Sequence, residues 1–311
     1  MALLKRKRVL AAKIETTSGS AESLTSAEAS FNCYDIEIQN EIDMSPREAQ
    51  GAFNMMPSVP GAYRGKVTFK HDLSWDGTAT EPTWADTFLP ACGLVKSSQT
   101  FYPKTEAPGS NVKTLTIGVY VDGMFKSIRG AAGNVKFNFP VGRAAFAEFE
   151  FTGAWVAPSD VAIISPTYPT ASALRYATST TTFNSVALLL ENLVFDVGNE
   201  VMMRESPANV AGYLGGIITN RVPKVTCNPE AKLVATRDVY GQLLAMTEAT
   251  LSWTLPGPTN SLMTFAAPKA QVVKATEGDR SNLVTDEIEF QLNRNGSTVD
   301  QEFSILFTAA S

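Results

Sequence analysis

The chain has 311 residues, of which 44% are hydrophobic and 18% are charged. That length and apolar fraction are enough to bury a sizeable core, and they favour about two domains. The formal net charge is −5, whereas proteins that wrap duplex DNA are normally basic because phosphate neutralisation dominates their affinity. The composition therefore argues against tight nucleic-acid binding.

The N-terminal residues 1–30 are predicted to form a flexible arm. After the basic run Lys5–Arg8, the apolar stretch is interrupted at Lys13, so it is too short for the core of a signal peptide. Small polar residues follow, a composition typical of a segment that orders on a partner. The sequence has no run of about 18 apolar residues, so we expect no membrane-spanning helix and no membrane partner.

Residues 31–157 are predicted to form a first β domain. Tyr34–Gln39 alternates apolar and polar side chains, the period of a strand with one dry face. Pro82–Leu89 gathers its apolar residues on one side and is followed by a glycine, which predicts a short helix. Asp122-Gly123 lies between two apolar runs and predicts a hairpin turn.

Residues 158–182 combine prolines with a Ser/Thr tract and are predicted to be a linker to a second β domain, 183–311. The second domain is predicted to contain a short helix around Asp238–Met246, between several strands. Asn295-Gly296 predicts a hairpin turn between its last two strands.

One apolar segment in each half lacks a regular period. The first, Met44–Gly61, is too apolar for a solvated loop, and the second spans Gly198–Gly216. Their candidate contact residues are Phe53, Met55, Met56, Met202 and Met203. Methionine adapts to imperfect surfaces, so the first segment either packs on its own domain or reaches a neighbouring subunit.

The most informative feature is a strand pattern that occurs twice. Glu148-Phe149-Glu150-Phe151 recurs as Glu287-Ile288-Glu289-Phe290, and each carboxylate is followed by an apolar side chain. A period of two indicates a strand with one solvent-exposed face, here called the wet face, and one buried face, here called the dry face. Because the order of the surrounding elements also matches, we expect a mainly β chain in which one domain is duplicated.

The sequence offers no constellation that would carry catalysis. His71 is the only histidine, and it lies in a predicted strand without a nucleophile motif, so we interpret it as a surface or interface residue. Three widely spaced cysteines favour a reduced protein without disulfides. We therefore predict no catalytic, metal-binding or cofactor-binding residues and no enzymatic activity.

Three segments together resemble the tail tube proteins, or major tail proteins, of long-tailed bacteriophages. They are the turn and strand Pro60–Phe69, the helix end Leu89-Pro90-Ala91-Cys92-Gly93, and the block Ile128–Phe139 leading to Phe149–Gly153. The last block is the most specific, and together the three cover most of the first half. The second half fits the family more loosely.

The resemblance implies two tandem tail-tube-like domains that form a β-sandwich or part of a barrel, each with a short α-helix packed outside. It implies homo-oligomeric rings stacked into a tube through which phage DNA passes without specific binding. Rings of six chains and rings of three two-domain chains are both possible, and we favour the trimeric pseudo-hexamer. Other tail proteins, such as the tape measure and the terminator, are the expected partners.

Further expectations concern location and contacts. The protein would belong to the virion tail, assembled in the cytoplasm of a host bacterium. Glu148, Glu150, Glu287 and Glu289 would face the lumen, although alternating Glu and Phe is also ordinary for any half-exposed strand. The apolar and methionine residues of the two irregular segments would contact the adjacent ring.

Two other functions fit parts of the sequence. One is a tail component that forms a single ring, such as a tail terminator or a distal tail protein. The other is a receptor- or carbohydrate-binding β module, which needs clustered exposed aromatic residues. The four tryptophans are dispersed along the chain, which argues against that module.

Overall fold

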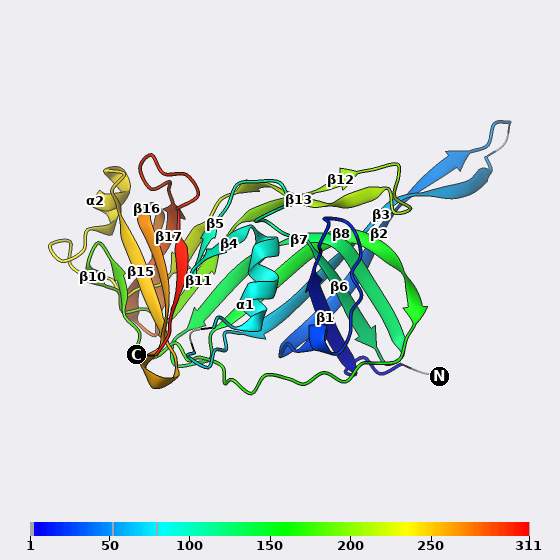
Figure 1. Ribbon diagram of the computed structural model, residues 1–311. Helices are drawn as coiled ribbons and strands as arrows, with labels where there is room; N and C mark the ends of the chain where they lie inside the picture. The colour runs from blue at the N-terminus through cyan, green and yellow to red at the C-terminus, as the bar shows by residue number, and fades with distance from the viewer. Residues whose placement is uncertain (1–2, 52, 79, 311) are drawn as a thin grey trace.

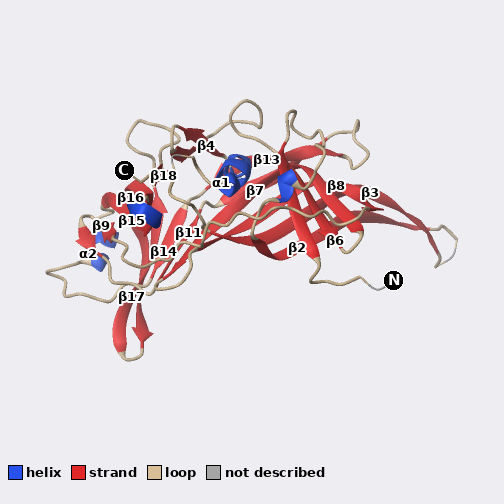
Figure 2. Cartoon of the chain, turned by 60° about the horizontal axis from the view of Figure 1, so that its bottom comes forward, coloured by secondary structure: helices blue, strands red, loops and turns tan. Residues whose placement is uncertain are grey.

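The structure is a computed structural model that describes residues 3–51, 53–78 and 80–310. The prediction of a mainly β chain is confirmed, because strands dominate the described residues and the helices are short (Figures 1 and 2). The arrangement as two tandem domains stays a prediction.

The strands are β1 (Arg8–Ile14), β2 (Cys33–Glu48), β3 (Met55–Asp72), β4 (Leu94–Ser97), β5 (Thr100–Pro103), β6 (Leu115–Val121), β7 (Met124–Pro140), β8 (Phe146–Asp160), β9 (Thr181–Phe183), β10 (Val186–Ala187), β11 (Asn192–Asp196), β12 (Asn199–Glu205), β13 (Tyr213–Arg221), β14 (Lys224–Cys227), β15 (Glu248–Pro256), β16 (Leu262–Arg280), β17 (Leu283–Leu292) and β18 (Ser304–Thr308). The α-helices are α1 (Thr83–Phe88) and α2 (Val239–Leu244), and the 3₁₀ helices are η1 (Ala27–Ala29), η2 (Leu89–Cys92) and η3 (Pro258–Asn260).

One antiparallel sheet joins the two halves of the chain. Its central order is β16-β17-β14-β11-β7-β8-β3-β2. The first four of these strands come from the second half of the sequence, and the last four come from the first half. The junction is the pairing of β11 with β7, in which Asp196 lies opposite Lys136. Strands β12 and β13 form a separate hairpin.

The N-terminal segment departs from the prediction of a flexible arm. Residues 8–14 form β1, which pairs with β6 along its whole length. Leu10, Ala11 and Ala12 are buried, and burial of apolar side chains stabilises an ordered strand. The polar residues that follow dominate the composition of the segment and mask this short apolar run.

The dry faces of the strands meet in one aromatic core that draws on both halves. Phe137 and Phe139 of β7 contact Phe265 of β16 with ring centroids 5.5 and 5.0 Å apart. Trp253 of β15 stacks on the same ring at 5.3 Å. Such aromatic pairs add to the stabilisation that comes from burial alone.

Helix α1 packs on the dry face of the sheet. Phe88 lies 5.0 Å from Phe69 and 5.1 Å from Phe149, measured between ring centroids. The two predicted short helices are confirmed as α1 and α2, and the Asp122-Gly123 turn joins β6 to β7. The predicted turn at Asn295-Gly296 is present, with an antiparallel bridge between Asn295 and Thr298. It does not join the last two strands into a hairpin, because β17 pairs with β16 and β14 whereas β18 pairs with β16 and β5.

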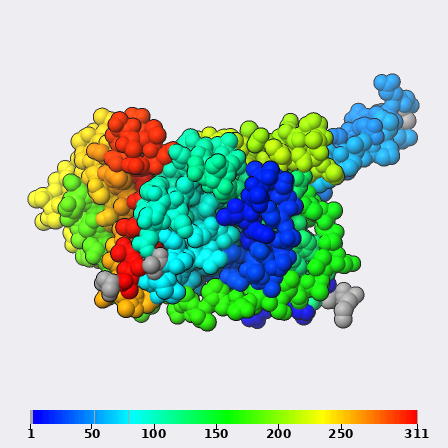
Figure 3. Space-filling model, in the orientation of Figure 1, coloured from blue at the N-terminus to red at the C-terminus, as the bar shows by residue number. Residues whose placement is uncertain are grey.

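Both segments that were predicted to be irregular are instead β-hairpins. Most of Met44–Gly61 belongs to the distal part of the β2–β3 hairpin, which projects from the body of the molecule (Figures 1 and 3). Most of Gly198–Gly216 belongs to β12 and β13. Prolines and β-bulges hid the period of two, since a bulge shifts the alternation of side chains by one residue.

The predicted linker is extended and partly buried. Strand β8 ends at Asp160, and β9 begins at Thr181. Between them, Leu174 is buried and donates its backbone N–H to the carbonyl of Leu73, while its own carbonyl accepts from Ala145. This segment therefore lies against the sheet over part of its length. The domain boundaries themselves stay a prediction.

Candidate assembly surfaces

The wet face of the sheet carries rows of alternating charge. Five neighbouring strands place one residue each in line, namely Lys70, Glu148, Lys136, Asp196 and Lys224. Residues that are directly opposite in an antiparallel pair share a face. Glu150 lies two residues beyond Glu148 along β8. In β17, Gln291 lies opposite Lys224, and Glu289 and Glu287 precede it at intervals of two. All four predicted lumen glutamates therefore lie on one face of one sheet.

Most carboxylates on this face have a lysine partner on the adjacent strand. The N–O distances are 2.7 Å for Lys66–Glu150, 2.8 Å for Lys224–Glu289, 3.1 Å for Lys136–Asp196 and 3.7 Å for Lys70–Glu148. The hydrogen bond to Glu289 raises the pKa of Lys224. The central face is therefore nearly balanced in charge, although four glutamates were expected to line the lumen.

A second repeated sequence accompanies the repeated glutamates. Lys66-Val67-Thr68 in β3 corresponds to Lys224-Val225-Thr226 in β14. Thr68 lies opposite Glu150, and Thr226 lies opposite Glu289. The diagonal lysine–glutamate pair occurs in the same register in both places. Sequence reasoning missed this Lys-Val-Thr signal, although it was visible as a repeat.

The two ends of the central strand order have open edges. In the described part of the chain, β3 is the only strand that pairs with β2. Strand β16 pairs with β15 as far as Gln271, and between Val272 and Arg280 its only strand neighbour among the described residues is β17. Such edges expose unpaired backbone groups that can pair with another chain.

The distal part of the β2–β3 hairpin is apolar and exposed. Phe53, Met55 and Met56 are all exposed, so they do not pack on their own domain. Met202 on β12 is also exposed, but Met203 is buried in a cluster with Ala154 and Ala211 of the same chain. The side chain of Met203 is therefore not available to an adjacent ring.

Helix α2 lies at the end of the molecule opposite the β2–β3 hairpin (Figure 1). Exposed apolar residues lie on α2, just after it and on β16, namely Tyr240, Leu244, Met246 and Val273. Leu244 is 82% exposed and Met246 is 69% exposed. Apolar residues that cluster on a surface indicate an interaction site more often than scattered ones do.

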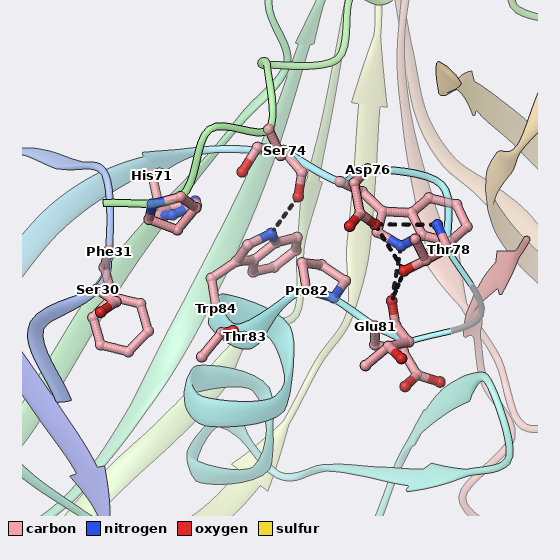
Figure 4. A pocket seen from close by; sticks show the side chains of 14 residues that line it. Ser30, Phe31, His71, Ser74, Asp76, Thr78, Glu81, Pro82, Thr83 and Trp84 are labelled. Carbon is pink, nitrogen blue, oxygen red and sulfur yellow. Dashed lines mark hydrogen bonds between the residues drawn. The ribbon is translucent and has the colours of Figure 1, made fainter. Parts of the chain in front are cut away.

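The single histidine lies in a pocket beside α1, not on the surface (Figure 4). His71 is buried, its ring centroid is 5.6 Å from that of Trp84, and its Nδ1 has no hydrogen-bond partner. Trp84 donates its Nε1–H to the carbonyl of Ser74 at 2.9 Å. Burial lowers the pKa of His71 to about 4.

Acidification is expected to destabilise the protein through His71. Its folded pKa of about 4 lies below the value of about 6.5 in an unfolded chain, so the unfolded state binds the proton first. Stability is then lost as the pH falls from about 6.5 towards 4. Urea unfolding should show about 2 kcal/mol more loss between pH 7 and pH 5 in the wild type than in His71→Leu. Equal losses in both proteins would contradict the assignment.

Comparison with known proteins leaves the chain without an assigned family. A scan against protein-family models and a search of curated proteins each found no match. Within residues 3–51, 53–78 and 80–310, no helix has the length and apolar character to cross a membrane. The same residues contain no group of three or more His, Cys, Asp or Glu side chains arranged to hold a metal ion.

Proposed function

We propose that this protein is a structural subunit of a phage tail, the major tail tube protein, and that it assembles into stacked rings around a DNA channel. The proposal rests on the residues that resemble that family and on the open edges of the sheet. Its location would be the virion tail, and DNA would pass without specific binding. Tape-measure and terminator proteins would be its partners at assembly.

The observation that carries this proposal is the repeated strand order. The series β16-β17-β14-β11 from the second half matches the series β7-β8-β3-β2 from the first half, strand for strand. The two series are aligned by one cross-strand pair in each. Thr68 lies opposite Glu150 in the first half, and Thr226 lies opposite Glu289 in the second half. The β11–β7 junction is then an internal example of how one series joins the next.

Ring closure follows if the same junction forms between chains. Strand β2 corresponds to β11 and β16 corresponds to β7, so β2 of one protomer would pair with β16 of the next. Such a head-to-tail contact closes into a ring when the rotation between copies allows it. Closure removes the open edges, and a barrel with many strands leaves an aqueous channel.

The correspondence predicts the register of the contact between chains. Asp196 pairs with Lys136 at the internal junction. In the aligned series Asp196 corresponds to Gln39, and Lys136 corresponds to Thr276. Gln39 of one protomer should therefore lie opposite Thr276 of the next. Because each chain supplies two series, we propose a ring of three chains with pseudo-sixfold symmetry.

Electron microscopy combined with cysteine cross-linking tests the function. The purified protein should form hollow filaments with a regular axial repeat. A variant with Gln39→Cys and Thr276→Cys should form covalent closed trimers on oxidation, since opposite residues in a sheet lie within disulfide range. The variants that carry only one of the two substitutions, and the wild type with its three native cysteines, serve as controls and should stay largely monomeric on a non-reducing gel.

The alternatives give different results in the same experiment. Isolated rings without filaments would favour a single-ring component such as a tail terminator or a distal tail protein. Monomers at high concentration without cross-links would contradict the proposal. A carbohydrate-binding module has less support, because all four tryptophan side chains are buried.

A further inference from the structure

The two hairpins that join corresponding strands have the same internal register. In the first, Met44 pairs with Pro60 and Ser45 pairs with Val59. In the second, the pairs are Val201 with Ile218 and Met202 with Ile217. Both hairpins also shift register at the same place, between Ile42 and Met44 and between Glu200 and Val201. The two hairpins are therefore equivalent in register from their base through these pairs.

The second hairpin, β12–β13, lies across the β7–β8 pair of its own chain. Asn199 donates its side-chain N–H groups to the carbonyls of Cys92, at 2.7 Å, and Gly133, at 3.0 Å. Gly215 approaches Gly130 so closely that a Cβ on Gly130 would lie 2.6 Å from the Cα of Gly215. The second hairpin thus covers the start of the neighbouring series.

This contact also reaches the end of the helix in the first series. Ile218 lies against Gly93, where an added Cβ would be 3.0 Å from the Cδ1 of Ile218. Gly93 has a φ of 72° and follows η2, which continues α1. Met246, with a φ of 52°, occupies the same left-handed position after α2. The two helix ends are therefore equivalent as well.

The first hairpin has no such surface to cover in its own chain. It projects away from the body of the molecule at the end that carries β2 (Figures 1 and 3). Met44 and Val59 are 54% and 46% exposed, whereas the corresponding Val201 and Ile217 are partly buried. An apolar hairpin without a partner in the monomer is a surface made for another chain.

The surface that would receive it is also apolar and exposed. The β12–β13 contacts map Ile42 beside Ala245 and beside the β16 bulge at Val273, the residue after Val272, which pairs with Phe290. They map Pro60 beside Met246. Ile42, Val273 and Met246 are exposed in the monomer. The two unpaired apolar surfaces lie at opposite ends of the molecule, as a head-to-tail contact requires.

We propose that the distal β2–β3 hairpin lies across the β16–β17 pair and the end of α2 of the next copy of this chain in the same ring. It would occupy the place that β12–β13 occupies within the chain. This inference deepens the proposed function and rests on it. It differs from the expectation drawn from the family resemblance, in which these residues contact the adjacent ring of the stack.

A cysteine pair at the positions equivalent to the Asn199–Gly133 contact tests the docking. In assembled protein, the variant with Ile42→Cys and Val273→Cys should give about tenfold more covalently linked oligomer with a short bis-maleimide than a control pair, since sites held together react at high effective concentration. The control combines Ile42→Cys with Val299→Cys, because Val299 is exposed but has no mapped contact with the hairpin.

The edge pair Gln39→Cys and Thr276→Cys separates failure of this inference from failure of the proposed function. Cross-linking at both pairs supports docking within the ring. Closed covalent trimers from the edge pair, without cross-linking between positions 42 and 273, would overturn the docking and leave the ring intact. Absence of both cross-links would remove the proposed function and the docking with it.

A second variant gives a readout that does not depend on cysteines. Met44→Asp with Val59→Asp places charges on the hairpin surface and leaves the core unchanged. If the hairpin docks within the ring, this variant should yield monomers. Intact rings that no longer stack would instead show a contact between rings and would overturn the inference. Circular dichroism of the monomer checks that the fold is retained.

Discussion

Replacing Phe265 with alanine is expected to lower the free energy of unfolding by about 3–5 kcal/mol, the usual cost of removing a large buried aromatic side chain. Phe265 is almost fully buried. Its ring contacts Phe137 and Phe139 from the first half of the chain and Trp253 from the second half. The cavity left behind would remove packing from both halves at once.

Because the core spans both halves, they should also unfold together. Urea titration followed by tryptophan fluorescence and by circular dichroism should show one transition for Phe265→Ala, at lower urea than for the wild type. The matched control is Phe53→Ala, the same substitution at an exposed position, which should change the monomer's stability by less than about 0.5 kcal/mol. Two separate transitions would show that the halves are independent folding units.

Changing Glu148, Glu150, Glu287 and Glu289 to lysine is expected to make the wet face of the sheet bind DNA. Each change removes one negative charge and adds one positive charge, so the formal net charge moves from −5 to +3. The new lysines would join Lys66, Lys70, Lys136 and Lys224 on the same face. Phosphate neutralisation would then give binding that weakens steeply as salt increases.

The fold should survive this charge reversal. The lost ion pairs are exposed, and such pairs contribute about 0.2–1 kcal/mol each. Lysines that face lysines add some repulsion across the strands. If the face lines the channel, tubes should still form, but assembled particles should eject their genome more slowly. DNA co-sedimentation with tubes at low and high salt measures the binding directly.

The control reverses the same number of charges elsewhere. Asp76, Glu81, Asp86 and Glu106 lie around α1 and in the loop that leads to β6. Reversal at these four positions gives the same net charge on a different surface. Slow ejection by the first variant alone supports a channel lining, whereas normal ejection from both would remove the assignment of the four glutamates to the lumen.

Much of the local structure could be predicted from sequence patterns. The alternation of Glu148–Phe151 and Glu287–Phe290 predicts strands with one wet face, and the structure has both strands. Helix α1 was predicted from apolar spacing and a following glycine, and α2 was predicted from apolar spacing alone. Prediction failed at Met44–Gly61, where prolines and bulges interrupt the alternation, and at Arg8–Ile14, where the apolar run is short.

The candidate surfaces could be predicted only in part. The glutamates were identified from their spacing, but their lysine partners on neighbouring strands were not, because those partners are distant in sequence. His71 was predicted to be a surface or interface residue, and the structure buries it beside Trp84. The exposed end of α2 gave no sequence signal, since Leu244 and Met246 are ordinary residues for a helix that packs on a core.

The strands with alternating faces and the strand pattern that occurs twice could be recognised from the amino-acid order, because side-chain alternation and turn residues act locally. The pairing of β11 with β7, and the open edges of β2 and β16, became apparent only in the folded chain. Strand pairing joins residues far apart in sequence, and its register depends on which faces are buried together. Those non-local contacts also bring the two halves into one core.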